Sequence, residues 1–121
     1  MAGTPESKVK DKIDKILKSC APHCWWHKPV QYGMGRRCLD YHCCMHGIYF
    51  AVEAKAPGEM PSKFQELTIK EIKAAGGRVF VIDGKDHSIE NLALWLATTH
   101  ERYMERQHEK TRRANAARVP E

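Results

Sequence analysis

No stretch of this 121-residue sequence approaches the roughly 18 consecutive apolar residues that a membrane-spanning helix needs. The opening Met-Ala-Gly-Thr-Pro-Glu also lacks the apolar core of a secretory signal peptide. Five cysteines are an odd number for a disulfide framework, and no export signal favours one. We therefore expect a cytoplasmic protein whose thiols are reduced.

The sequence contains no internal repeat and no low-complexity tract, and its 42% hydrophobic and 29% charged residues suit one domain with a buried core. The net charge of +5 is unevenly spread. Residues 1–40 hold eight Lys/Arg against four Asp/Glu, residues 41–101 hold six against eight, and residues 102–121 hold six against three. Basic ends around a mildly acidic middle favour a polyanionic partner, with plain solubility as the alternative.

Periodicity predicts a first helix that begins near Thr4, a suitable N-cap followed by Pro5 at the first helical position. Its apolar residues lie on an arc of about 100° when placed at 100° per residue. Glu6 falls inside that arc, whereas every Lys and Asp of the segment falls outside it. One carboxylate of this helix is therefore expected to face inward.

The remaining pattern predicts a mixed α/β fold. An irregular turn over residues 21–29 leads to a short edge strand, and a flexible loop covers residues 31–37. Two strands follow as a β-hairpin, then a helix, then a buried strand parallel to the second hairpin strand, over residues 39–44, 48–55, 61–75 and 78–83. A last helix, capped by Ser88, leads into a basic stretch. The final dozen residues of the chain are expected to be loose.

The hairpin carries the chemistry. An even-numbered turn around His46-Gly47 places Asp40 opposite Glu53, with Lys55 on the same face and apolar side chains on the other. Facing carboxylates repel each other unless a divalent cation lies between them. Hard cations such as Mg²⁺ use one or two carboxylates and stabilise charge on a phosphate under attack. The arrangement predicts metal-assisted phosphodiester hydrolysis.

Asp40, the Glu53-Ala54-Lys55 run, and Gln65 on the next helix resemble the PD-(D/E)XK nuclease superfamily. Within it, residues 50–58, Gln65 and residues 76–83 are similar to the VRR-NUC nucleases. Leu39 departs from the pattern, which has Pro before the first acid. The resemblance implies a restriction-endonuclease-like core, a small mixed β-sheet flanked by helices. It would form a nuclease domain over residues 1–100, followed by a basic helix end and flexible tail over residues 101–121.

The same resemblance implies a role for each matched residue. Asp40 and Glu53 would ligate a catalytic Mg²⁺ or Mn²⁺, helped by the backbone carbonyl of Ala54. Lys55 would orient or activate the attacking water and stabilise the phosphate, leaving 5′-phosphate and 3′-hydroxyl ends. Glu6 would be the acid of the first helix and a further metal ligand, and Gln65 would support the site.

Two of these residues have alternative roles. Glu6 could simply complement the helix dipole in the first turn. Ser62-Lys-Phe-Gln65 is a capping-box pattern, in which Gln65 would bond to the N-cap backbone.

The expected substrate is DNA, contacted through its phosphates by Arg36, Arg37 and Lys63, although Arg36 and Arg37 could equally belong to a solvated loop. The basic C-terminal stretch would strengthen salt-dependent binding. Stand-alone VRR-NUC nucleases resemble dimeric enzymes that cut branched DNA such as Holliday junctions. The resemblance thus implies a homodimeric endodeoxyribonuclease with a structure-specific substrate, compatible with phage origin.

A rival interpretation rests on two Cys/His clusters. They comprise Cys20, His23, Cys24 and His27, and then Cys38, His42, Cys43, Cys44 and His46. Together they could bind zinc in a non-catalytic nucleic-acid-binding module. Neither cluster has the paired spacing of a zinc ribbon, so buried thiols and ordinary loop histidines are the other possibility.

Overall fold

The structure, a computed structural model, describes residues 3–30 and 38–118. The described residues form α1 (Pro5–Ser19), β1 (Cys24–His27), β2 (Tyr41–Met45), β3 (Ile48–Ala54), α2 (Lys63–Ala74), β4 (Arg78–Ile82) and α3 (Asp86–Ala117). The strands make a four-stranded sheet in the order β1-β2-β3-β4. The first three are antiparallel, and β3 and β4 are parallel. The predicted mixed α/β fold and its βαβ unit are confirmed, and the edge strand β1 lies within residues 24–27, inside the segment predicted as an irregular turn.

A two-residue turn joins β2 to β3 and sets their register. His46 and Gly47 both have positive φ, 50° and 82°, as a type I′ turn requires. Tyr41 then pairs with Val52, and the next step along the ladder brings Asp40 beside Glu53. The predicted register is therefore confirmed.

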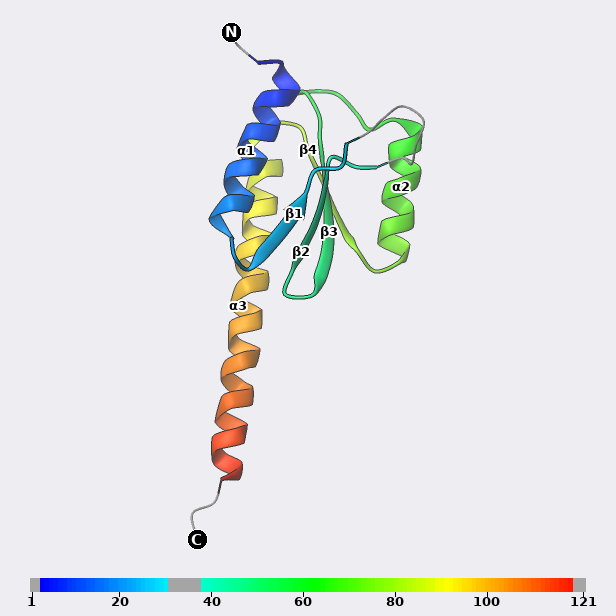
Figure 1. Cartoon of the computed structure of the whole chain (residues 1–121). Helices are drawn as coiled ribbons and strands as arrows, with labels where there is room; N and C mark the ends of the chain where they lie inside the picture. The colour runs from blue at the N-terminus through cyan, green and yellow to red at the C-terminus, as the bar shows by residue number, and fades with distance from the viewer. Residues whose placement is uncertain (1–2, 31–37, 119–121) are drawn as a thin grey trace.

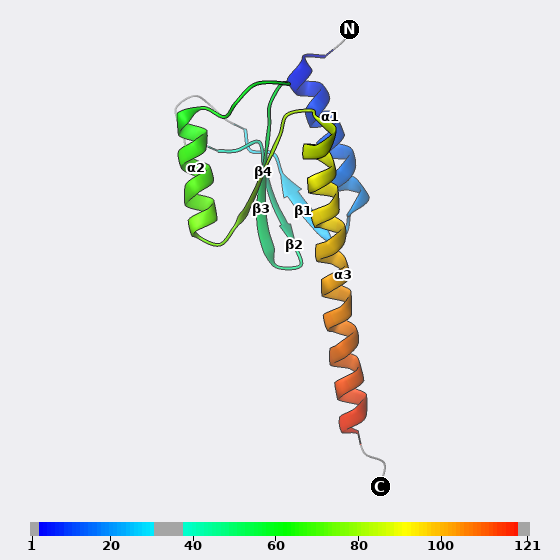
Figure 2. The ribbon, with the colours of Figure 1, turned by 180° about the vertical axis from the view of Figure 1, so that it is seen from behind.

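Helices α1 and α3 cover one face of the sheet, whereas α2 lies on the other (Figures 1 and 2). The main core fills the space beneath α1 and α3. Its members are Val9, Ile13, Leu17, Cys24, Tyr41, Cys43, Met45, Phe50, Val52, Ala54, Ile82, Leu92 and Leu96. Helix α1 begins as predicted, with Thr4 accepting a hydrogen bond from the Ser7 N–H. The core contacts bury one face of β3, so the polar side chains of this strand lie on its opposite face.

Helix α2 has a defined signal at each end. Ser62 caps its first turn, and Gly76, at φ 92°, terminates it before β4. The following Gly77 packs so closely that an added Cβ would lie 2.7 Å from the Ile72 side chain. No side chain of α2 is fully buried.

Helix α3 differs from the expectation at both ends. It begins at Asp86 after Lys85, while the hydroxyl of Ser88 bonds to Asp83, so Ser88 is not its cap. It continues through Ala117, well past the hairpin (Figure 1). The prediction that the final dozen residues are loose is thus wrong for those up to residue 117, which are helical. Good helix formers and the ion pairs of Glu109 with Arg112 and Arg113 favour the continuation.

The long α3 is a charged helix. Among the described residues, no helix combines the length and apolar character required to cross a membrane.

Candidate active site

Asp40 and Glu53 meet at the end of the hairpin opposite its turn. The backbone N–H of Asp40 donates to Oε1 of Glu53 at 3.1 Å. In return, the backbone N–H of Ala54 donates to Oδ2 of Asp40 at 2.8 Å. Each strand thus uses a backbone N–H to hold the carboxylate of the other strand. The two acids lie together, as the sequence predicted.

Glu53 is the centre of this site because its side chain is only 2% exposed. The ammonium Nζ of Lys55 lies 3.3 Å from Oε2 of Glu53, and Lys55 itself is 13% exposed. The amide nitrogen of Gln65 donates to the same Oε2 at 2.5 Å. Asp40, just before β2, Glu53 and Lys55, at and just beyond the end of β3, and Gln65 of α2 are therefore brought together.

Gln65 fulfils both of the roles that the sequence left open. Its carbonyl oxygen accepts the backbone N–H of Ser62 at 2.9 Å, and its own N–H donates to the Ser62 hydroxyl at 3.2 Å. These two bonds are a complete capping box. The side-chain NH₂ remains available and reaches Glu53, because a glutamine amide offers an acceptor and two donors.

Burial raises the pKa of Glu53, and the nearby negative charge of Asp40 raises it further. Lys55 opposes this shift without cancelling it. The pair is thus electrostatically unfavourable in its fully ionised form. A divalent cation would relieve that repulsion, and carboxylate oxygens are ligands suited to Mg²⁺ or Mn²⁺. The donors present, with the predicted carbonyl of Ala54 between Glu53 and Lys55, fit such an ion.

Glu6 reaches this site through a lysine that the sequence analysis did not single out. The Nζ of Lys10 lies 3.7 Å from Oε2 of Glu6 and 3.6 Å from Oδ1 of Asp40. Glu6 is also in the first turn of α1, where its charge complements the helix dipole. The i,i+4 spacing of Glu6 and Lys10 was the available signal. Lys10 therefore links the acid of the first helix to the carboxylate pair.

The predicted DNA contacts are placed only in part. Lys63 is exposed at the first residue of α2, two positions before Gln65. Arg36 and Arg37 lie outside the described residues. The basic C-terminal stretch belongs to α3, which begins at the end of the sheet where β4 ends and runs past the hairpin turn at the other end (Figure 1). Its cations thus lie away from Glu53.

The two predicted Cys/His clusters do not each form a zinc site within the described residues, but one histidine from each cluster, His23 and His46, comes together. Cys24 and Cys43 are buried in the main core, where burial raises the pKa of each thiol. The group of three potential metal ligands in this part of the chain adds His100 to these two histidines. Sequence reasoning missed His100 because it is 54 residues beyond His46.

A scan against protein-family models and a search of curated proteins give no match to this chain. The functional argument therefore depends on the geometry of the site and on the residues that form it.

Proposed function

We propose that this protein is a divalent-metal-dependent DNA endonuclease with a restriction-endonuclease-like core of the PD-(D/E)XK type, similar to the VRR-NUC nucleases. One observation carries the proposal: Asp40 and Glu53 meet across the hairpin beside the ammonium group of Lys55. A purely structural sheet gains nothing from burying a carboxylate beside another one. The small mixed sheet flanked by helices supports the same proposal.

Asp40, Glu53 and the carbonyl of Ala54 would hold Mg²⁺ or Mn²⁺, with Glu6 as a further candidate near Asp40. The bound ion would supply Lewis-acid stabilisation of the charge that develops on the scissile phosphate. Lys55 forms an ion pair with Glu53, and from this position its ammonium group would orient the attacking water. The same positive charge would stabilise the phosphate during in-line displacement.

Gln65 and Lys10 would act on the carboxylates and not on the substrate. The Gln65 amide holds one oxygen of Glu53, which limits the rotation of that side chain. Lys10 lies beside both Glu6 and Asp40 and offsets part of their charge. These contacts preorganise the site before DNA binds.

Branched DNA is the proposed substrate class, and a homodimer the proposed active form. Lys63 supplies an exposed cation near the site, and α3 supplies others further away. Such contacts favour recognition of backbone and shape over base sequence. Two copies of one site would suit a two-fold symmetric junction. A monomeric mass by light scattering at micromolar concentration, with and without a four-way junction, would contradict the dimer.

The experiment compares the wild type with Asp40→Ala and Lys55→Ala on linear, nicked, flapped and four-way DNA, with Mg²⁺ or with a chelator. We expect cleavage by the wild type in Mg²⁺ alone, and its loss in both variants. Lys70→Ala is the matched control, because Lys70 is an exposed lysine of α2 outside the site. Equal cleavage by the wild type and by Asp40→Ala would disprove the proposal.

The rival non-catalytic module makes a different prediction. If the protein is such a module, it should retain zinc tightly and bind DNA, but it should cleave none of the four substrates in Mg²⁺. Zinc retained together with Mg²⁺-dependent cleavage is compatible with a nuclease that also has a separate zinc site.

A further inference from the structure

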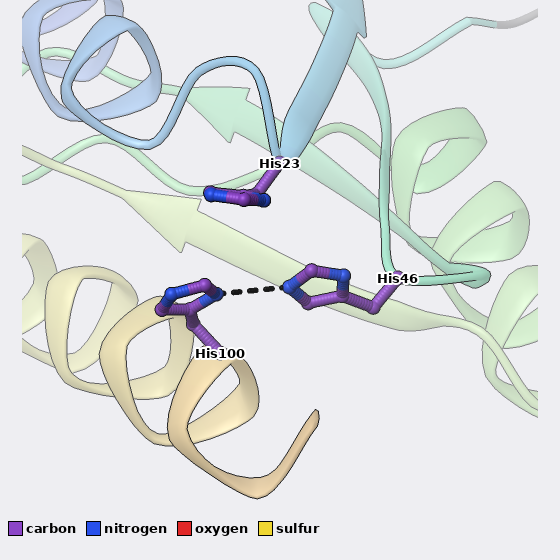
Figure 3. Close-up of side chains that lie close together, drawn as sticks. All are labelled: His23, His46 and His100. Atoms are coloured by element: carbon purple, nitrogen blue, oxygen red, sulfur yellow. Dashed lines mark hydrogen bonds between the residues drawn. The ribbon is translucent and has the colours of Figure 1, made fainter. Parts of the chain in front are cut away.

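Three histidines from distant parts of the chain converge at the end of the sheet opposite the carboxylate pair. His23 precedes β1, His46 is in the β2–β3 turn, and His100 is on α3 (Figure 3). One ring nitrogen from each lies within 4.8 Å of the other two. We propose that these three imidazoles bind a zinc ion, independently of the proposed nuclease site.

The distances are close to those that zinc requires. Nε2 of His46 lies 3.0 Å from Nδ1 of His100. Two nitrogens bound to one tetrahedral zinc at 2.0–2.1 Å lie about 3.3 Å apart. The His23 ring is also near, with its centroid 4.5 Å from that of His100 and 5.4 Å from that of His46. Small side-chain rotations would therefore bring all three nitrogens onto one ion.

The backbone of His46 is compatible with this use of its side chain. Its φ of 50° lies in the left-handed region, in a turn position where Asn, Asp or Gly is preferred. Left-handed backbone costs an ordinary residue roughly 1 kcal/mol. Histidine is among the non-glycine residues enriched in this region, so the turn accepts it and holds its imidazole within hydrogen-bond distance of His100.

The imidazole of His46 is also held in a defined orientation. It stacks on the ring of Tyr103 with centroids 3.6 Å apart and planes inclined by only 6°. Tyr103 lies one helical turn beyond His100 on α3. The stack thus fixes one ligand toward another before any ion binds, which lowers the entropy cost of coordination.

Imidazole nitrogens favour zinc and other borderline transition metals, whereas Mg²⁺ prefers oxygen ligands. Three protein ligands leave a fourth position that water would complete. An ion here would join the turn before β1, the hairpin turn and α3. It would therefore stabilise the position of α3 against the sheet, since a ligand that binds only the folded state raises its stability.

The test measures zinc binding to the full chain, without an affinity tag and after treatment with a chelator. We expect one zinc per chain by elemental analysis, and a higher melting temperature with Zn²⁺ but not with equal Mg²⁺. Co²⁺ in place of zinc should give the visible spectrum of a tetrahedral site with nitrogen and oxygen ligands. A thiolate-to-cobalt charge-transfer band would place cysteines around the metal and overturn the proposal.

Two variants remove one ligand each while preserving the local backbone. His46→Asn keeps a residue suited to the turn, and His100→Gln keeps a side chain suited to a helix. Each should weaken zinc affinity at least about 10–100-fold, the range seen even for supporting residues of metal sites. His108→Gln is the matched control, because His108 is an exposed histidine of the same helix. Zinc binding that is equal in all four proteins, or absent from the wild type, would overturn the proposal.

Discussion

The amide nitrogen of Gln65 lies 2.5 Å from Oε2 of Glu53, so the residue that completes the cap of α2 also holds the buried carboxylate. The start of α2 is thereby coupled to the site through one side chain. A capping box ordinarily concerns helix stability alone. Here, the same glutamine fixes where α2 begins and how Glu53 is oriented.

The two roles of Gln65 can be separated by comparing Gln65→Ala with Ser62→Ala. Ser62→Ala removes a cap bond without touching Glu53, and should cost about 1 kcal/mol of unfolding free energy. Gln65→Ala removes a cap bond and the bond to Glu53, so it should also lower the cleavage rate about 10–100-fold. Chemical denaturation and single-turnover cleavage give the two readouts. An equal loss of activity in both variants would mean that Gln65 acts only through the helix cap.

Lys55→Met tests the ammonium group while keeping the length of the side chain. We expect single-turnover cleavage to fall by roughly 10²–10⁴-fold, the range typical of an acid–base or charge-stabilising group. Stabilisation of the fold by Mg²⁺ should remain, because the oxygen ligands are intact. Lys70→Met serves as the control for loss of one lysine. A Lys55→Met variant with near-normal cleavage would contradict the assigned role.

The carboxylate pair was predictable because a hairpin register is a local property. His46-Gly47 fits a two-residue turn, and period-two alternation then determines which residue faces which. The parallel pairing of β3 and β4 was predictable for a similar reason, because a strand, a helix and a second strand in one sheet form a crossover between parallel strands.

Contacts between distant segments were not predictable in this way. Lys10 reaches Asp40 only after α1 packs against the sheet, and His100 reaches His46 only because α3 lies beside the hairpin turn. The residue pattern within a single helix or strand cannot predict which distant segments come into contact. The length of α3 was also underestimated, although Gly and Pro are absent from residues 86–117, because nothing in the pattern marked where the helix ends.

The raised pKa of Glu53 predicts how the metal-free protein responds to pH. The folded state takes up the Glu53 proton more readily than the unfolded chain does, whose Glu pKa is about 4.3. This contribution to stability is complete below that pH and is lost as the pH rises through the folded pKa. Glu53→Gln cannot ionise, so in a chelator it should be more stable than the wild type at pH 8, by on the order of 1–3 kcal/mol.

The measurement is the difference in unfolding free energy between Glu53→Gln and the wild type from pH 4 to pH 8. The lowered pKa values of His42 and His46 act in the opposite direction, but they are common to both proteins and cancel in the difference. Adding Mg²⁺ should stabilise the wild type and leave Glu53→Gln nearly unchanged. A difference that does not grow with pH would show that Glu53 ionises without penalty.

The second half of α3 predicts a salt-dependent contribution to DNA binding. Basic residues recur there at i,i+4 and i,i+3 spacing, which places them on one side of the helix. They are Arg102, Arg106, Lys110 and Arg113. Replacing all four by Gln should weaken binding and lower the slope of log affinity against log salt by up to about 0.9 per lost phosphate contact.

These cations lie well away from Glu53, because α3 rises about 1.5 Å per residue as it leaves the site. Cleavage at saturating protein should therefore stay within about two-fold of the wild type in the four-residue variant. A charge-matched control replaces four exposed lysines elsewhere by Gln. They are Lys12, Lys15, Lys18 and Lys73. If the control lowers the salt slope as much as the α3 variant does, DNA binding depends on net charge and not on the four basic residues of α3.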